Sequence, residues 1–407
     1  MKAPFLGKIR LFWCSDCNIP ILEKICSCCG TLASKLRIAP PGDVRPAFAK
    51  DYEIIRAAVG KISGYLTDFF TYPILLNHVS EVDRADEVIS DGFNLGLLIF
   101  DSNNWEFYFK ISHEGAKVLF SYVLLKKKNF WKSIKHFKYV VVDKVAGEKI
   151  SEGFNVLPPG IISYSSFSKG ERILVFSEDN YLVGVGNAIV DSHDIDGMQR
   201  GVVIKTKTKN LRMNEEDAFR LIETILKSRI KLDELTEKIS DGSPKSRHIL
   251  YIDQYDPYKL FPKGIADYWR LIIACNEKHI KALEREATSF IRNTIRKKES
   301  HVAISFSGGK DSIVLLHILA NLQKVLKFEI TPLFIDLGIQ QDNYSQVSNK
   351  IVKRNCKKLG LDVNIVKIQE EYGFSIDDVF AKKLRRCCRV KFTNLVSVRC
   401  TERIKLN

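Results

Sequence analysis

The sequence lacks long hydrophobic runs, internal repeats and low-complexity tracts. No stretch reaches ~18 consecutive apolar residues, so no membrane-spanning helix and no membrane partner are expected. Lys2 and Lys8 interrupt the N-terminus before the apolar core of a secretory signal could form, which predicts a cytoplasmic protein. Of the 407 residues, 45% are hydrophobic and 27% are charged, which is typical of a globular chain with two or three domains.

The chain has fewer acidic residues than basic ones. The chain has 63 Lys and Arg residues against 48 Asp and Glu, which gives a net charge of +15 at pH 7. A basic surface favours anionic partners such as nucleic acids and nucleotides, because binding a phosphate backbone releases its counterions. The same excess could serve solubility alone, so charge leaves both interpretations open.

The ten cysteines are unevenly distributed. Five lie within the first 29 residues, and Cys387 and Cys388 are adjacent. In a long chain expected in the cytoplasm, such clusters indicate metal or redox chemistry rather than a disulfide framework. The isolated Cys275 and Cys356 are predicted to be packed core thiols.

Two Cys-x-x-Cys pairs near the N-terminus predict a structural zinc site. Cys14 with Cys17 and Cys26 with Cys29 form two knuckles that together complete a tetrahedral set of four sulfurs, and Cys28 is an alternative ligand to one neighbour. Few apolar residues lie nearby, so the metal is expected to hold the segment together. Four thiolates also suit iron, which leaves a rubredoxin-like or iron–sulfur site as the alternative.

Changes of composition and turn signals divide the chain into five parts. The predicted parts are a zinc-ribbon-like segment at 1–48, an α+β domain at 49–138, a β-rich domain at 139–210, a helical region at 211–284 and an α/β domain at 285–407. An amphipathic helix is predicted at 276–298, and strands alternate with helices after it. The predicted class is a multidomain protein with α/β and all-β parts.

A glycine-rich run lies between a predicted strand at 302–306 and a predicted helix at 312–322. It reads Ser307-Gly308-Gly309-Lys310-Asp311-Ser312. The free N–H groups and the dipole of a helix start favour a phosphate there, and two glycines let the backbone close around it. Lys310 supplies a mobile positive charge, the serine hydroxyls can donate hydrogen bonds, and Asp311 suits Mg²⁺ or a helix cap. The run therefore predicts a nucleotide-phosphate site.

This run matches the signature of the PP-loop ATP pyrophosphatases, which residues 285–407 resemble. The resemblance implies a HUP-type doubly wound parallel sheet, with ATP and Mg²⁺ used to adenylate a substrate. The branch of the phosphoadenosine phosphosulfate (PAPS) reductases is most similar, on Asp336-Leu337-Gly338 and on the basic Arg385–Lys391 segment. It implies nucleotide binding by Ser307–Ser312, Asp336 and Gly338. The implied catalytic residues are Lys310, Asp311, Cys387 and Cys388.

The resemblance ends soon after the cysteine pair, before a further half-sheet of the family. Three parallel strands would leave an exposed edge, so this domain is expected to be incomplete. The basic run around Cys387 and Cys388 stabilises a thiolate, which suits sulfur relay. In related reductases such a pair ligates a [4Fe–4S] cluster, which would need ~4 thiolates and therefore a chain that continues past Asn407. Simple packing of both cysteines is the alternative.

The β-rich part resembles a PUA domain, an RNA-binding pseudobarrel. The resemblance rests on five runs in order: Val140–Ala146, Ile150–Val156, Pro159–Ile161, Phe167–Glu171 and Val183–Gly186. Lys169, Arg172, Arg200 and Lys205 are predicted to meet RNA phosphates. A barrel that serves only as a spacer is the alternative.

Together these features predict a PP-loop enzyme of the PAPS reductase family that adenylates a target, with thiolation of an RNA such as tRNA as the purpose. The expected partners are RNA, a nucleotide, and a sulfur donor or thiol reductant. One alternative is thiol-dependent reduction of PAPS to sulfite, although a small sulfonucleotide needs neither a PUA-like module nor zinc knuckles. Another is an RNA-binding protein whose nucleotide domain is not catalytic.

Overall fold

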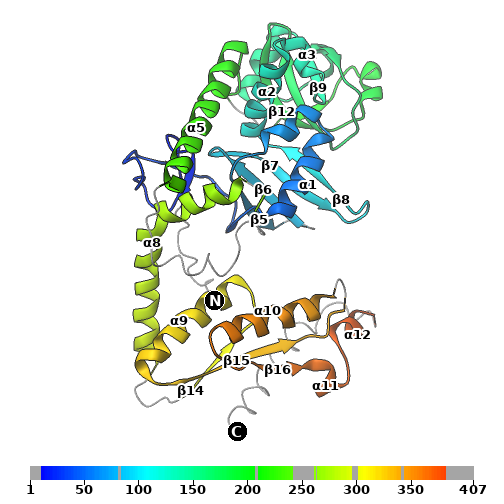
Figure 1. Ribbon diagram of the computed structural model, residues 1–407. Coiled ribbons are helices and arrows are strands. Elements are labelled where there is room, and N and C mark those ends of the chain that lie inside the picture. Colours follow the sequence, from blue (N-terminus) through cyan, green and yellow to red (C-terminus); the bar gives the residue numbers. More distant parts are fainter. Residues whose placement is uncertain are drawn as a thin grey trace. The chain divides into compact units, whose positions relative to one another are not determined.

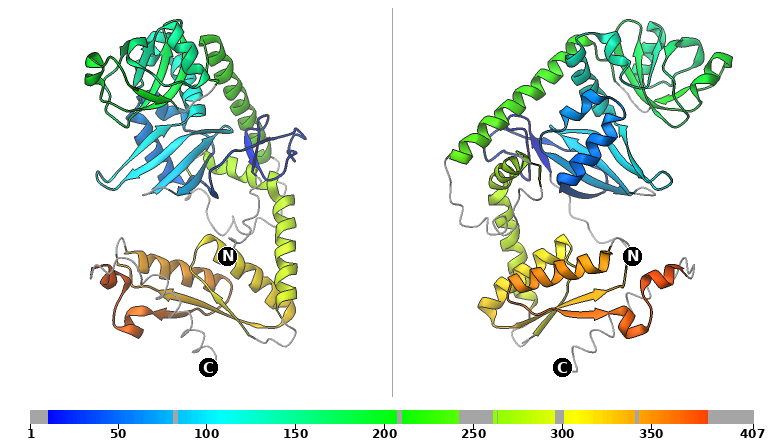
Figure 2. Two further views of the ribbon diagram at one scale, coloured as in Figure 1. Left: turned by 180° about the vertical axis from the view of Figure 1, so that it is seen from behind. Right: turned by 45° about the vertical axis from the view of Figure 1, so that its right-hand side comes forward.

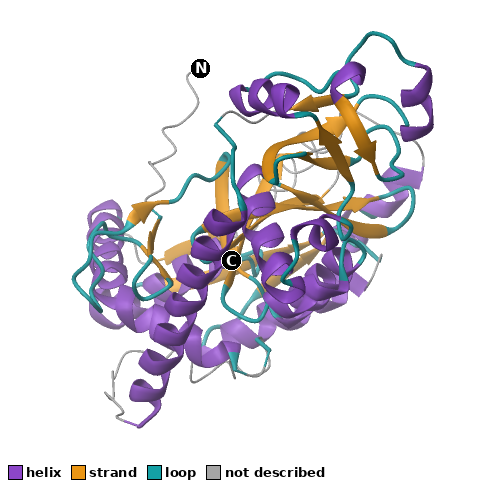
Figure 3. Cartoon of the chain, turned by 90° about the horizontal axis from the view of Figure 1, so that it is seen from above, coloured by secondary structure: helices purple, strands orange, loops and turns teal. Residues whose placement is uncertain are grey.

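A computed structural model describes residues 11–80, 84–206, 210–241, 261–262, 264–295, 301–340 and 343–381 (Figure 1). The chain forms two compact units, Met1–His279 and Ile280–Asn407. Both units contain helices and strands (Figure 3), which confirms the predicted mixture of α/β and all-β structure. None of the described helices is long and apolar enough to cross a lipid bilayer.

The first unit begins with a small sheet that carries the N-terminal cysteines. Its strand order is β2 (Ile19–Ile21), β1 (Phe12–Cys14) and β3 (Ser34–Lys35). Phe12, Trp13 and Ile19 are buried in the main core of the unit. The expectation that only a metal could hold this segment is therefore wrong, because these side chains also anchor it to the rest of the unit.

A five-stranded antiparallel meander follows. Its strands are β4 (Pro41–Pro46), β5 (Ile74–Ser80), β6 (Arg84–Ser90), β7 (Phe93–Asp101) and β8 (Glu106–Ile111). Asp91 and Gly92 form the two-residue turn between β6 and β7, both at positive φ (53° and 82°), as a tight hairpin turn requires.

Helices cover this meander. They are α1 (Ala49–Gly60), the 3₁₀ turn η1 (Gly64–Phe69), α2 (His113–Lys127) and α3 (Phe130–Ile134). The Ser112 hydroxyl accepts a hydrogen bond from the Gly115 amide at 2.8 Å and starts α2. Asn129 starts α3 in the same way, accepting from the Lys132 amide at 2.8 Å.

The β-rich part forms its own core. Strands β10 (Ile161–Tyr164), β9 (Tyr139–Val142), β11 (Arg172–Ser177), β12 (Tyr181–Ala188) and β13 (Ile204–Thr206) lie in that order, with the helix α4 (Lys144–Glu152) after β9. Among these described strands, only β9 and β11 pair in parallel. The backbone approach at Gly160 is close, since a Cβ there would lie 2.7 Å from the Ala146 Cβ.

Two long helices complete the first unit and lead to the second. They are α5 (Glu215–Asp241) and α8 (Ile265–Thr294). The cysteine-bearing sheet, the meander and the start of α8 contribute to one hydrophobic core, which includes Leu11 and Ile272, so these parts pack together. Helix α8 begins 11 residues before the predicted helix at 276–298. Its early turns bury Ile265 and Trp269, so the tertiary core extends it.

The second unit is the predicted alternation of strands and helices. Its elements are β14 (His301–Ser305), α9 (Lys310–Leu326), β15 (Glu329–Asp336), α10 (Tyr344–Lys358), β16 (Asn364–Lys367), α11 (Ile368–Tyr372) and α12 (Ile376–Ala381). The strands are parallel in the order β14-β15-β16. Because both crossovers advance in one direction, the usual right-handed connection puts α9 and α10 on the same face of the sheet (Figure 2).

Candidate functional site

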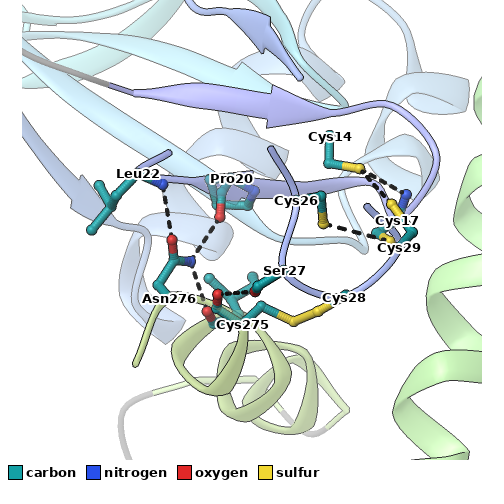
Figure 4. The surroundings of a disulfide bond; sticks show 11 residues. Cys14, Cys17, Pro20, Leu22, Cys26, Ser27, Cys28, Cys29, Cys275 and Asn276 are labelled. Carbon is teal, nitrogen blue, oxygen red and sulfur yellow. Dashed lines mark hydrogen bonds between the residues drawn. A yellow bond between two sulfur atoms is a disulfide. The ribbon is translucent and has the colours of Figure 1, made fainter. Parts of the chain in front are cut away.

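The four cysteines predicted as ligands lie together in the first unit. The sulfur atoms of Cys14, Cys17, Cys26 and Cys29 all lie within 4.8 Å of one another (Figure 4). The Sγ atoms of Cys14 and Cys29 are 3.5 Å apart, and those of Cys17 and Cys26 are 3.9 Å apart. A zinc ion with four sulfur ligands at about 2.3 Å would space its ligands by roughly 3.8 Å. The cluster therefore fits a tetrahedral metal.

Crowding of the four sulfurs shifts the pKa values of the cysteines in opposite directions. The hydrogen bond from Cys17 lowers the pKa of Cys14 to about 5, whereas burial raises the pKa of Cys26 to about 11. The hydrogen bond to Cys14, burial and the neighbouring sulfurs raise the pKa of Cys17. Four thiolates so close together repel one another, and a bound divalent cation would offset that repulsion.

The fifth cysteine of this segment lies outside the four-sulfur cluster. Cys28 forms a disulfide with Cys275 of α8, with their Cα atoms 5.9 Å apart (Figure 4). The prediction of Cys275 as a free packed thiol is therefore wrong. Next to it, the Asn276 side chain accepts from the Leu22 amide at 2.8 Å and donates to the Pro20 carbonyl at 3.1 Å. These contacts hold the cysteine-bearing segment on α8.

Sequence reasoning missed a buried ion pair beside this segment. The Arg229 guanidinium of α5 donates to both carboxylate oxygens of Asp91 at 2.9 and 2.7 Å. Asn18 donates to Asp91 at 2.8 Å and accepts from the Trp13 indole at 3.0 Å. Burial disfavours the charged form of Asp91, but Arg229 and the hydrogen bonds outweigh it and hold the pKa of Asp91 below its usual value. In the sequence, the helical pattern around Arg229 indicates only that this residue lies on a helix.

The predicted phosphate loop joins β14 to α9 in the second unit. Gly308 has a φ of +75°, a conformation that glycine adopts without a steric penalty. A Cβ there would lie 3.2 Å from Val352 and 3.3 Å from Ile351 of α10. Gly309 is the residue before the first turn of α9, and no side chain caps that helix. The loop therefore presents the amino end of a helix, where an anion is favoured.

Serine side chains brace the loop. The Ser307 hydroxyl accepts from the Gly309 amide at 3.3 Å and lies 3.2 Å from the Ser312 hydroxyl. The Ser312 hydroxyl donates to the Gly309 carbonyl at 2.9 Å. Lys310 and Asp311 are exposed in the first turn of α9, so both charged groups can meet a ligand from solvent.

A cavity of about 140 Å³ opens beside the loop at the carboxyl ends of β14 and β15. Ser307, Asp336 and Tyr344 are among its lining residues. Parallel sheets bind ligands at this edge. Asp336 is largely buried, and its carboxylate accepts from the Gly338 amide at 3.0 Å and from Asn349 at 2.6 Å. Burial raises the pKa of Asp336, but these bonds and one from Ser345 outweigh it and lower the pKa.

Of the three cysteines Cys356, Cys387 and Cys388, the structure describes only the first. Cys387 and Cys388 lie outside the described residues, as does the basic segment around them. Cys356 of α10 is buried, as predicted, and burial raises its pKa to about 11. It is therefore a packed thiol and not a reactive one.

The residues predicted to bind RNA differ in exposure. Lys169, Arg200 and Lys205 are exposed on the β-rich domain. Arg172 is less available to RNA phosphates, because its guanidinium donates to the Ile111 carbonyl at 2.7 Å and to Asn187 at 3.1 Å. Burial lowers the pKa of Arg172. Its contacts tie β11 to β8 and indicate a structural role.

Comparison with known proteins identifies two domains. The PUA domain family matches residues 138–209, and the PP-loop domain family matches residues 279–394. The first match covers the five-stranded β-rich part, and the second covers the phosphate loop and its parallel sheet.

Three relatives show the range of similarity. An uncharacterized protein of Methanocaldococcus jannaschii is 30% identical over 337 residues, which cover 83% of this chain and 59% of that protein. A tRNA-5-methyluridine(54) 2-sulfurtransferase of Pyrococcus horikoshii is 34% identical over 110 residues, 27% of this chain and 34% of that protein. A cytoplasmic tRNA 2-thiolation protein 1 of Chlamydomonas reinhardtii is 32% identical over 111 residues, 26% of this chain and 30% of that protein.

The chain thus spans 59% of the length of the first relative and about a third of the length of the other two. None of the three is named as a PAPS reductase, so that branch stays a prediction. Both family matches cover the parts for which the sequence motifs predicted them. The chain therefore joins a PUA domain and a PP-loop domain behind a zinc-ribbon-like cysteine segment.

Proposed function

We propose that the protein uses ATP and Mg²⁺ to adenylate an RNA, and that the adenylated base is then thiolated. The observation that carries this proposal is the phosphate loop at the amino end of α9, which opens beside a cavity lined by Ser307 and Asp336. Relatives named as tRNA thiolation proteins match about a quarter of the chain and support tRNA as the RNA.

In this proposal the loop binds the leaving group. An oxygen of the target base attacks the α-phosphorus of ATP, the bond to the β-phosphate breaks, and pyrophosphate leaves. The amide groups around Gly308 and Gly309, the dipole of α9 and the Lys310 ammonium stabilise the negative charge on pyrophosphate. Asp311 would hold Mg²⁺, which supplies further charge compensation. Asp336 and Gly338 shape the wall of the nucleotide site.

The sulfur step is assigned to the C-terminal cysteines. We propose that Cys387 or Cys388 accepts sulfur from a persulfide donor and that this cysteine persulfide attacks the activated base, with AMP as the leaving group. The thiol of the other cysteine then cleaves the S–S bond, which releases the thiolated base and leaves a disulfide for an external thiol to reduce. Positive charge in the surrounding sequence would stabilise the thiolate that the step needs. Cys356 is unsuited to this role because it is buried with a raised pKa.

The other parts are proposed to support this chemistry. The four-cysteine cluster holds zinc as a structural ion, with iron as the alternative that metal analysis would identify. The PUA domain contributes RNA contacts, with Lys169, Arg200 and Lys205 exposed for that purpose. The proposal also includes a cytoplasmic location and a division of the chain into five parts, at 1–48, 49–138, 139–210, 211–284 and 285–407.

The test is pyrophosphate release by the full chain from ATP, Mg²⁺ and an unmodified tRNA transcript. We expect release to depend on tRNA and to be lost in Lys310→Ala. Lys324→Ala removes an exposed lysine from the last turn of the same helix and should leave release unchanged. Sulfite release from PAPS with a thiol would instead favour a reductase. RNA binding with neither activity would favour a non-catalytic adaptor.

A further inference from the structure

The positive charge of the protein is not on its PUA domain. Residues 138–209 contain nine Lys and Arg residues and nine Asp and Glu residues, so this domain has no net charge at pH 7. Asp191 and Asp194 lie close together on it, and Asp191 accepts from the Lys169 amide at 2.8 Å. An RNA-binding surface needs positive charge to release counterions, and this domain supplies little of it.

Charge is concentrated instead in a segment immediately before the PUA domain, which shares only Lys138 with it. Residues 126–138 contain six lysines and no acidic residue, a net charge of +6 within a chain of +15. Five of these lysines are exposed on the end of α2, on α3 and on the turn that follows: Lys126, Lys128, Lys132, Lys135 and Lys138. We call these five residues the lysine surface. No described carboxylate forms an ion pair with Lys126, Lys128, Lys132 or Lys135.

Helix stability accounts for only part of this arrangement. Lys126 and Lys127 lie in the last turn of α2 and Lys132 lies in the last turn of α3, where positive charge interacts favourably with the helix dipole. That interaction contributes only about 0.3–1 kcal/mol for each exposed lysine and is screened by salt. Six like charges within 13 residues repel one another, and an anionic partner would relieve that repulsion.

Two exposed aromatic rings accompany the lysines. Trp131 is 40% exposed and lies between the lysines in sequence. Tyr65 is 39% exposed, its ring lies 4.3 Å from the Lys127 ammonium, and it meets the His136 ring edge-on at 5.1 Å. Exposed rings beside cations are the platform on which unpaired RNA bases stack. The other large apolar side chains of the segment, Phe130, Ile134 and Phe137, are buried, which leaves little apolar surface to enter a lipid bilayer.

We propose that the lysine surface is the principal RNA-binding site of the protein, with phosphates held by Lys126, Lys128, Lys132, Lys135 and Lys138 and an unpaired base stacked on Trp131. This inference rests on the proposed function, because it identifies where that RNA binds. It places the main electrostatic contacts before the PUA domain rather than on its rim.

The test compares two triple variants of the full chain by the salt dependence of tRNA binding. The first is Lys128→Gln/Lys132→Gln/Lys135→Gln, and the second replaces three lysines of the PUA domain, Lys144→Gln/Lys169→Gln/Lys205→Gln. Each phosphate contact contributes roughly 0.7–0.9 to the slope of log K against log salt. We expect the first variant to lose about 2–3 units of slope and roughly 50- to 150-fold in affinity at 0.15 M salt. The PUA-domain variant should lose less slope and less affinity than the first.

A single variant tests the stacking contact separately. Trp131→Ala should weaken binding of poly(U) roughly 5- to 100-fold without a change in the salt slope. An equal or larger loss of tRNA affinity in the PUA-domain triple than in the lysine-surface triple would overturn the inference. So would a lysine-surface triple that keeps its tRNA binding but loses binding to vesicles rich in phosphatidylserine. In either case tRNA-dependent pyrophosphate release could persist, which separates failure of this inference from failure of the proposed function.

Discussion

Removing the Arg229 side chain charge should destabilise the first unit by about 3–5 kcal/mol, because it leaves Asp91 buried without its partner. The side chains of Arg229 and Asp91 are only 4% and 1% exposed, so water cannot replace the lost contact. Arg229→Met would also remove the guanidinium from the Phe69 and Tyr72 rings, which lie 4.2 and 4.5 Å away. A midpoint lower by roughly 6–15 °C is expected for a unit of this size.

Tryptophan fluorescence during thermal unfolding is the assay. All four tryptophans lie in the first unit, at positions 13, 105, 131 and 269, so the signal reports that unit alone. The matched control is Arg220→Met on the same helix, whose exposed partner Glu216 is 3.3 Å away. Such a surface pair contributes about 0.5 kcal/mol or less. A shift under about 2 °C for Arg229→Met would refute the reasoning.

The remaining predictions concern pH, metal, the loop and the disulfide. The pKa of Asp91 is lowered in the folded state, so the stability that its carboxylate contributes is present above its unfolded pKa and is lost as the pH falls. The difference in melting midpoint between the wild type and Asp91→Asn should therefore shrink from about pH 5 downward in the same fluorescence assay. Cys17→Ser should abolish bound zinc by elemental analysis and lower the melting midpoint, whereas the distant Cys356→Ser should retain the metal. Gly308→Ala should cost about 1–2 kcal/mol and weaken ATP binding by calorimetry, whereas Gly360→Ala, also at positive φ (+68°) but without near contacts, should preserve binding. Cys275→Ser should lower stability by about 2–5 kcal/mol without reductant and have little effect with it; an equal effect in both would contradict a formed disulfide.

Short-range patterns predicted much of the candidate site. The cysteine knuckles depend on residues within 15 positions of one another, and the phosphate loop is six consecutive residues at a strand-to-helix junction. The periods of helices and strands also predicted the alternation of β14 to β16 with α9 and α10. These features are local, so the chemistry of neighbouring residues is enough to predict them.

Exposure and partner choice were less predictable. Arg172 and Lys169 are three residues apart and have similar charge, but one is fixed inside the unit by Ile111 and the other is exposed. The lysine-rich segment is plain in the sequence, whereas its exposed rings became visible only with α2, α3 and η1 in place. The burial of a residue depends on which other parts of the chain pack against it, and a local sequence pattern does not contain that information.

The sequence by itself determined the phosphate loop, the four-cysteine set and the two domain types, because each depends on residues that lie close together along the chain. Only the tertiary structure decided that Cys28 pairs with Cys275 across 247 residues and that Arg229 pairs with Asp91 across 138. The physical reason is that such contacts form when a shared hydrophobic core brings distant segments together, and the cost of ordering them is offset by the whole core rather than by the pair itself.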